Sequence, residues 1–135
     1  MEGVVITVER RQFPEAMDWE DGNWLVSPIR IAVGRFVGEL PAQLRTDELA
    51  SFRQGLEKIR ESLNGEAELS SMDGWLSLSI RCSRNGSLAI SGLADDKPGI
   101  GNKLRFEIDG MDQSFLPDLI DQLRAVEQAF PSRRS

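Results

Sequence analysis

Strict alternation of apolar and polar residues over residues 76–82 identifies a β-strand with one buried side. The apolar positions are Leu76, Leu78, Ile80 and Cys82. The Asn85-Gly86 dipeptide that follows predicts a two-residue turn, because both positions of such a turn need a positive φ angle. Leu88 and Ile90 then alternate on the returning stretch. The sequence therefore predicts an antiparallel hairpin over this stretch.

Further strands are expected on both sides of this hairpin. Residues 4–10 are rich in β-branched side chains, which favours an early strand. Two more strands are expected between residues 29 and 44, where apolar residues again alternate. The remaining alternating stretches are residues 67–71, before an Asp73-Gly74 turn, and residues 104–108.

Two stretches show helical spacing of their apolar residues. Thr46 is expected to cap the first helix, and Asn64-Gly65 to end it. Pro117 is expected in the first turn of the second helix, and Pro131 to stop it. The apolar stripes comprise Leu49, Phe52, Leu56, Ile59 and Leu63 in the first helix, and Leu116, Leu119, Ile120, Leu123, Val126 and Phe130 in the second.

These elements predict one α+β domain over residues 1–131, followed by a frayed tail at residues 132–135. We expect a twisted, mainly antiparallel sheet of six or seven strands with two helices packed on one face. A chain of 135 residues is long enough to bury a self-sufficient core.

The residue types that the chain lacks exclude much catalytic chemistry. There is no His, no Tyr and one Cys, Cys82. An internal disulfide, a Cys/His zinc site and a Ser-His or Cys-His nucleophile pair are therefore excluded. Cys82 is expected to be a buried structural thiol, although the neighbouring Arg81 and Arg84 would favour a reactive one. We expect a protein that is not an enzyme and holds no cofactor and no metal.

The charge balance indicates the kind of partner. Acidic residues outnumber basic ones by 22 to 16, for a formal net charge of −6. This excess argues against nucleic acid and anionic membranes as partners and favours a basic protein. The N-terminus lacks the features of a signal peptide, and no run of about 20 apolar residues is present. With a single unpaired Cys as well, we expect a cytoplasmic protein.

Residues 15–24 are the most unusual segment, since they carry four carboxylates and two tryptophans but no Lys or Arg. One interpretation is an interface in which tryptophans anchor a basic partner and carboxylates steer it. The other is that the tryptophans cover the end of the sheet while the carboxylates are merely solvated. The partner-binding candidates of this segment are Asp18, Trp19, Glu20, Asp21 and Trp24.

Three further partner-binding candidates lie outside this segment. Asp95 and Asp96 open a glycine-containing loop over residues 95–102. Its carboxylates could bind a divalent cation, or its glycines could let backbone amides approach a ligand. The other interpretation is that the loop only connects two strands. Trp75 either presents an exposed aromatic on the open side of the sheet or packs against Met72 or a neighbouring strand. An open face or edge of the sheet would also allow a homodimer.

Four stretches of the chain carry a family resemblance. They are Leu40-Pro41-Ala42 to Phe52, Leu69-Ser70-Ser71-Met72-Asp73-Gly74-Trp75-Leu76-Ser77-Leu78, Pro98-Gly99-Ile100-Gly101-Asn102-Lys103-Leu104-Arg105-Phe106 and Asp112-Gln113-Ser114-Phe115-Leu116-Pro117. In this order they resemble a family of small, mostly uncharacterised bacterial cytosolic proteins. Part of that family consists of immunity proteins paired with wall-associated, contact-delivered tRNA-nuclease toxins. The resemblance implies a protein that binds and blocks a toxin, and it assigns no catalytic residue.

The sequence thus favours a non-enzymatic protein-binding domain, an immunity protein that neutralises a basic toxin of the nuclease type. Nuclease toxins need basic surfaces to hold RNA, and an acidic inhibitor competes for such surfaces. The alternative is a small-molecule or metal-binding module of unknown role, in which residues 95–102 close over a site.

Overall fold

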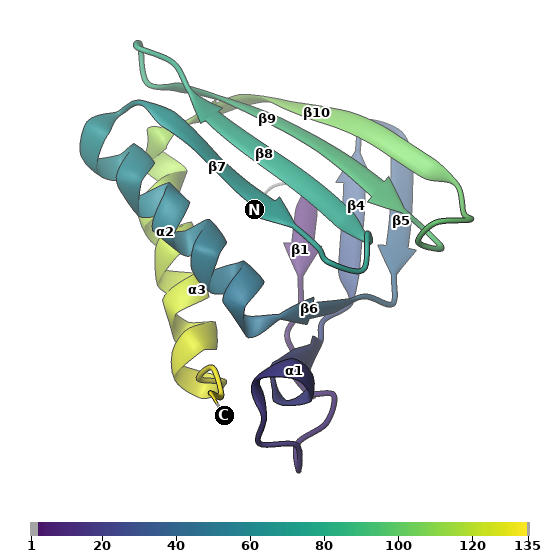
Figure 1. The fold of residues 1–135 in the computed structure, drawn as a ribbon. Coiled ribbons are helices and arrows are strands. Elements are labelled where there is room, and N and C mark those ends of the chain that lie inside the picture. The colour runs from purple at the N-terminus through teal and green to yellow at the C-terminus, as the bar shows by residue number, and fades with distance from the viewer. Residues whose placement is uncertain (1–2, 135) are drawn as a thin grey trace.

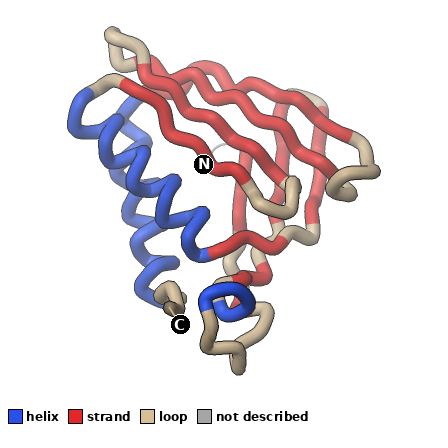
Figure 2. Tube along the Cα trace, in the orientation of Figure 1, coloured by secondary structure: helices blue, strands red, loops and turns tan. Residues whose placement is uncertain are grey.

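The computed structural model describes residues 3–134 and confirms an α+β fold of antiparallel sheets and helices (Figure 1, Figure 2). The strands are β1 (Val4–Ile6), β2 (Arg10–Arg11), β3 (Trp24–Val26), β4 (Ile29–Val33), β5 (Phe36–Leu40), β6 (Gln43–Arg45), β7 (Gly65–Ser70), β8 (Leu76–Cys82), β9 (Ser87–Asp95) and β10 (Lys103–Asp112). The helices are α1 (Trp19–Gly22), α2 (Thr46–Ser62), the short 3-10 helix η1 (Gln113–Phe115) and α3 (Leu116–Ala129). The two long helices, α2 and α3, lie side by side on one face of the sheet, as predicted.

The strands are divided more finely than the sequence predicted. Within residues 3–134 there are ten strands in three antiparallel sheets, with the orders β10-β9-β8-β7, β1-β4-β5 and β2-β3-β6. The expected strand at residues 4–10 is split, since β1 pairs with β4 whereas β2 pairs with β3. Pro28 lies between β3 and β4 and has no N–H to donate, so the ladder is interrupted there.

The four-stranded sheet confirms the alternation predicted for residues 76–82. Leu76, Leu78 and Ile80 of β8 are all buried. Leu78 pairs with Gly92 of β9, and Gly92 pairs in turn with Phe106 of β10. The Phe106 ring lies over Gly92, where an added Cβ would meet the ring at 2.2 Å. A glycine is therefore needed at this point of the sheet for steric reasons.

The β8–β9 hairpin closes through a longer loop than the two-residue turn predicted from Asn85-Gly86. Cys82 pairs with Leu88, and the amide of Ser83 donates to the carbonyl of Ser87 at 3.0 Å. Gly86 has a φ of 84°, whereas Asn85 does not have a positive φ. This is the pattern of a turn followed by one left-handed residue, the G1 bulge, which needs a positive φ at a single position.

Both ends of α2 differ by one or two residues from the prediction. The N-cap is Arg45 rather than Thr46, and the side chain of Glu48 accepts a hydrogen bond from the Arg45 amide at 2.8 Å. At the other end, the left-handed residue is Leu63, with a φ of 54°, one position before Asn64-Gly65. α3 has Pro117 in its first turn, as predicted.

Candidate functional site

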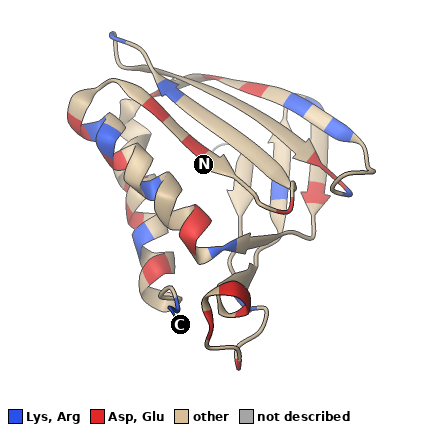
Figure 3. Cartoon of the chain, viewed as in Figure 1, with Lys and Arg blue, Asp and Glu red and all other residues tan. Residues whose placement is uncertain are grey.

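The acidic segment that contains α1 lies at one end of the molecule, below the sheets and beside the C-terminal end of α3 (Figure 1). Figure 3 shows the acidic residues of α1 at this end of the chain. The carboxylate of Asp18 caps the helix by accepting a hydrogen bond from the amide of Asp21 at 3.1 Å. Glu20 and Asp21 occupy the first turn, where the helix dipole favours negative charge. The predicted loop therefore contains one turn of helix.

Arg45 holds this helix in place. Its guanidinium donates to the carbonyl oxygen of Trp19 at 2.7 Å, to that of Glu20 at 2.6 Å and to the carboxylate of Asp47 at 2.9 Å. The guanidinium carbon also lies over both indole rings, 5.5 Å from the ring centroid of Trp19 and 5.0 Å from that of Trp24. The Arg45 side chain is only 4% exposed. A buried cation thus joins the two tryptophans and satisfies carbonyls of α1.

Two further arginines bind backbone carbonyls of the same segment. Arg11 donates to the carbonyl of Gly22 at 2.7 Å and to that of Pro131 at 2.5 Å. Burial, together with the charge of Arg133, lowers the pKa of Arg11. Arg133 donates to the carbonyl of Pro14 at 2.9 Å and to that of Ala16. Ser132 and Arg133, which we expected to be frayed, are therefore tied to the rest of the fold, Ser132 through a hydroxyl contact with Thr46 at 2.8 Å.

Because these arginines bind carbonyls, they leave the carboxylates of the segment available. Glu20 and Asp21 are exposed, and neither forms an ion pair with any residue between 3 and 134. The backbone of the segment is thus fixed while its negative charges face solvent. Such an arrangement suits binding of a cationic partner, since the ordering cost has been met within the fold.

An exposed apolar rim accompanies these charges. Trp19 is 42% exposed and Met72, in the turn between β7 and β8, is 71% exposed. Both line a shallow hollow of about 260 Å³. We call this region the Trp19 surface, formed by Trp19, Glu20, Asp21, Trp24, Arg45, Asp47 and Met72.

Glu48 ties the turn that carries Met72 to the start of α2. One carboxylate oxygen of Glu48 accepts from the Arg45 amide, and the other accepts from the amide of Met72 at 2.5 Å. Burial raises the pKa of Glu48, while these two hydrogen bonds oppose the rise. The same carboxylate therefore joins the start of α2 to the turn that presents Met72.

The structure brings together four of the eight predicted partner-binding residues, Trp19, Glu20, Asp21 and Trp24, in one hollow. Asp18 lies next to them and caps α1. The sequence did not single out Arg45, Asp47 or Met72. The one local signal for Arg45 as the N-cap of α2 was Glu48, three residues later, because Glu at that spacing is typical of a capping box.

Trp75, Asp95 and Asp96 are not among the residues that line this hollow. Trp75 is half-buried and packs against the core, and its carbonyl accepts from the amide of Asp95 at 3.0 Å. The buried carboxylate of Asp95 accepts from the amides of Lys97 at 3.0 Å and Gly99 at 3.2 Å, and from Lys103 Nζ at 3.0 Å. The hydrogen bond from Lys103 is the main cause that lowers the pKa of Asp95.

Asp96 is exposed, and its carboxylate accepts from the amide of Asn102 at 2.7 Å. Both carboxylates of the loop thus hold residues 95–103 together. No group of three or more His, Cys, Asp or Glu side chains that could hold a metal ion is present within residues 3–134.

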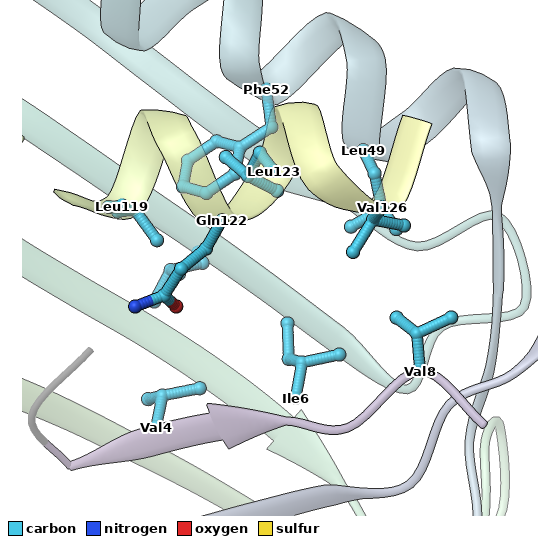
Figure 4. A pocket seen from close by; sticks show the side chains of 10 residues that line it. Val4, Ile6, Val8, Leu49, Phe52, Leu119, Gln122, Leu123 and Val126 are labelled. Atoms are coloured by element: carbon cyan, nitrogen blue, oxygen red, sulfur yellow. The ribbon is translucent and has the colours of Figure 1, made fainter. Parts of the chain in front are cut away.

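An apolar cavity of about 90 Å³ lies between β1 and α3 (Figure 4). Val4 and Ile6 line it from the β1 side, Leu119 and Leu123 from α3, and Gln122 adds a polar group at its margin. This volume is well below the roughly 300–1,000 Å³ of typical ligand pockets.

Comparison with known proteins adds the following findings. The chain matches the immunity protein WapI-like family over residues 2–131. No curated protein matches it with significant similarity. A solved structure of Trypanosoma brucei MRP1/MRP2 gives a TM-score of 0.49 at 10% sequence identity, covering 95% of this chain and 86% of that chain. No helix in the described part of the chain has the length and apolar character needed to cross a bilayer.

Proposed function

The chain belongs to the immunity protein WapI-like family, and from that premise we propose that it is a non-enzymatic inhibitor that binds a basic, nuclease-type toxin in the cytoplasm. The site of contact that we propose is the Trp19 surface. Its exposed carboxylates would occupy the basic groove that the toxin uses for RNA.

One observation supports this site above others, namely that the backbone of the acidic segment is held in place and its charges are unpaired. Three arginines, Arg11, Arg45 and Arg133, bind backbone carbonyls of residues 14–22. Glu20 and Asp21 remain exposed. Preorganised, unpaired charges attract an oppositely charged partner over long range and lose little entropy on binding.

The residues of the Trp19 surface have different roles in this proposal. Trp19 and Met72 would supply the apolar anchor, because aromatic residues and Met are enriched at interface cores. Glu20 and Asp21 would supply charge complementarity. Asp18 and Trp24 would act through position, since Asp18 caps α1 and Trp24 stacks on Arg45.

We assign the loop over residues 95–103 a smaller role in toxin binding. Asp95 is buried and its carboxylate is used within the loop, so we place it outside the contact. Asp96 and Trp75 remain predicted contacts with the toxin, at the margin of the interface.

The test uses the nuclease domain of a wall-associated toxin from the same organism, mixed with the full chain. We expect the chain to bind the domain and to stop its cleavage of tRNA. The variant Glu20→Lys/Asp21→Lys should weaken binding at least about tenfold, because each lost charge pair at an interface is worth on the order of 1 kcal/mol or more. Trp19→Ala should weaken it similarly.

The matched control is Glu61→Lys/Asp121→Lys, which changes the net charge equally on exposed helical positions away from the Trp19 surface. This control should bind with nearly unchanged affinity at moderate salt. Equal weakening by both double variants would show that only total charge matters. Failure of the unmodified chain to bind or inhibit the toxin domain would overturn the proposed function.

A further inference from the structure

The strand β5 forms an open edge of the β1-β4-β5 sheet. It pairs with β4 on one side, and no strand of the described residues pairs with its other side. Phe36 and Val37 lie on this strand and are 64% and 62% exposed. An edge strand with large apolar side chains is prone to pair with another strand.

The edges of the four-stranded sheet are protected in a way that β5 is not. Edge strand β10 carries exposed charges at Lys103, Arg105 and Glu107, and edge strand β7 carries them at Glu66 and Glu68. Charges along an edge oppose pairing with a further strand. The apolar start of β5 therefore differs from both of these edges.

The two faces of β5 are fixed by its register with β4. Phe36 and Gly38 oppose Val33 and Ile31, and Ile31 is buried. Gly38 has open space on this face, since no heavy atom lies within 4 Å of an added Cβ. An exposed aromatic ring thus stands two residues from an unfilled position on the same face.

We propose that β5 pairs antiparallel with β5 of a second copy of this chain, with Val37 at the two-fold axis. In this register Phe36 of one copy lies opposite Gly38 of the other, and the two Val37 side chains face each other. An aromatic residue that covers an edge glycine, and a β-branched pair at the axis, are both favourable cross-strand contacts.

The same register also pairs opposite charges. Arg35 belongs to the β4–β5 turn and directly precedes β5, and in this register it comes next to Glu39 of the other copy, once on each side of the axis. Arg35 is exposed, and it forms no ion pair with the residues described. Glu39 is exposed and binds Arg30 of its own chain at 2.8 Å. The apolar and glycine positions of β5 match those of a second, antiparallel β5, and the turn residue Arg35 matches Glu39 in charge. This self-complementarity favours a second copy over an unrelated partner.

The resulting dimer would join two three-stranded sheets into one of six strands. β5 lies on the side of the molecule away from α2 and α3 (Figure 1). No residue of the Trp19 surface belongs to β5, so the proposed dimer is independent of the function proposed above.

The test is the molar mass of the full chain in solution, measured by sedimentation equilibrium from low to high micromolar concentration. We expect the unmodified chain to reach the dimer mass. Val37→Lys should stay at the monomer mass, because it places two lysines at the axis. Its circular dichroism spectrum should match that of the unmodified chain, since Val37 is exposed. Its melting temperature should not change with concentration, whereas that of the dimeric chain should rise with concentration.

Two charge variants test the register itself. Arg35→Glu alone and Glu39→Arg alone should each favour the monomer, because each places like charges opposite each other. A mixture of these two variants should restore the dimer mass, since every acidic side chain of one copy then faces a basic side chain of the other. Arg105→Glu on the β10 edge is the control and should leave the dimer unchanged.

Three results would overturn the proposal. One is a monomer mass for the unmodified chain at high micromolar concentration, and another is a dimer that persists in Val37→Lys. The third is a mixture of the two charge variants that stays monomeric. Loss of toxin binding in Val37→Lys, with a monomeric unmodified chain, would assign β5 to the toxin instead.

Discussion

The side-chain amide of Asn23 and the backbone of Arg133 form a reciprocal pair of hydrogen bonds. Asn23 Nδ2 donates to the Arg133 carbonyl at 3.0 Å, and the Arg133 amide donates to Asn23 Oδ1 at 2.8 Å. Asn23 is fully buried and also donates to the carbonyl of Trp19 at 3.0 Å. One side chain therefore links the end of α1 to the C-terminal residues of the chain.

Deletion of residues 132–135 should loosen the acidic segment. It removes Arg133, whose side chain binds the carbonyls of Pro14 and Ala16, and leaves Asn23 buried without two of its hydrogen bonds. We expect a loss of about 1–3 kcal/mol in the free energy of unfolding. Hydrogen exchange should show faster exchange of the Asp21 and Gly22 amides. Deletion of residues 134–135 alone keeps Arg133 and should change neither quantity.

Replacement of Arg45 should be among the most costly single changes. Arg45→Ala removes hydrogen bonds to Trp19, Glu20 and Asp47 and opens space between two indole rings. We expect a loss of about 2–4 kcal/mol in the free energy of unfolding, measured by urea denaturation. Arg45→Lys should recover only part of it, because one ammonium does not reproduce the planar fork of donors.

The control for Arg45 is Arg81→Ala, at an exposed position whose ion pair with Glu66 is 3.8 Å long. It should change the free energy of unfolding by less than about 0.5 kcal/mol. If Arg45→Ala were as mild as this control, the buried guanidinium would not be what holds α1.

The strands β7 to β10 were predictable because apolar and polar residues alternate along each of them. Leu76, Leu78 and Ile80 need only a period of two to identify their strand and its buried side. The N-terminal strands were harder, since their division depends on which neighbour each short stretch meets. Pro28 gave the one local sign of that division, through its missing N–H.

The candidate site was only half predictable, for a physical reason. The sequence pointed to Trp19, Glu20 and Asp21 through their unusual composition. It did not point to Arg45 or Arg133, because these side chains bind backbone carbonyls. Every residue has a backbone carbonyl, so the sequence does not show which of them an arginine binds. Contacts of this kind become visible only when the chain is folded.

The contact between Gly92 and Phe106 gives a prediction for the sheet. Gly92→Ala should lower the free energy of unfolding by about 1–3 kcal/mol, because its Cβ would overlap the Phe106 ring. In the double variant Gly92→Ala/Phe106→Leu, the smaller side chain should absorb part of this cost. A double-mutant cycle from urea denaturation measures the coupling. Strictly additive losses would show that the ring and Gly92 do not constrain each other.

The buried carboxylate of Asp95 gives a prediction for acid stability. The hydrogen bond from Lys103, with those from the amides of Lys97 and Gly99, lowers the pKa of Asp95 in the folded state, against the opposing effect of burial. A carboxylate whose pKa is lower in the folded than in the unfolded state stabilises the fold above its unfolded pKa of about 3.9. That contribution is lost as the pH falls through the folded pKa.

Asp95→Asn should therefore lower the free energy of unfolding at pH 7, since its amide would face the donors of Lys103 and Gly99. The gap between this variant and the unmodified chain should narrow as the pH falls below about 4, because the carboxyl of Asp95 is then protonated in the unfolded state, and at lower pH in the folded state too, so the stabilisation from its charge is lost. Urea denaturation at a series of pH values measures the gap. Asp109→Asn, at an exposed position of β10, serves as the control with a small gap at every pH. A gap for Asp95→Asn that stays constant down to strong acid would contradict a stabilising role for the charge of this carboxylate.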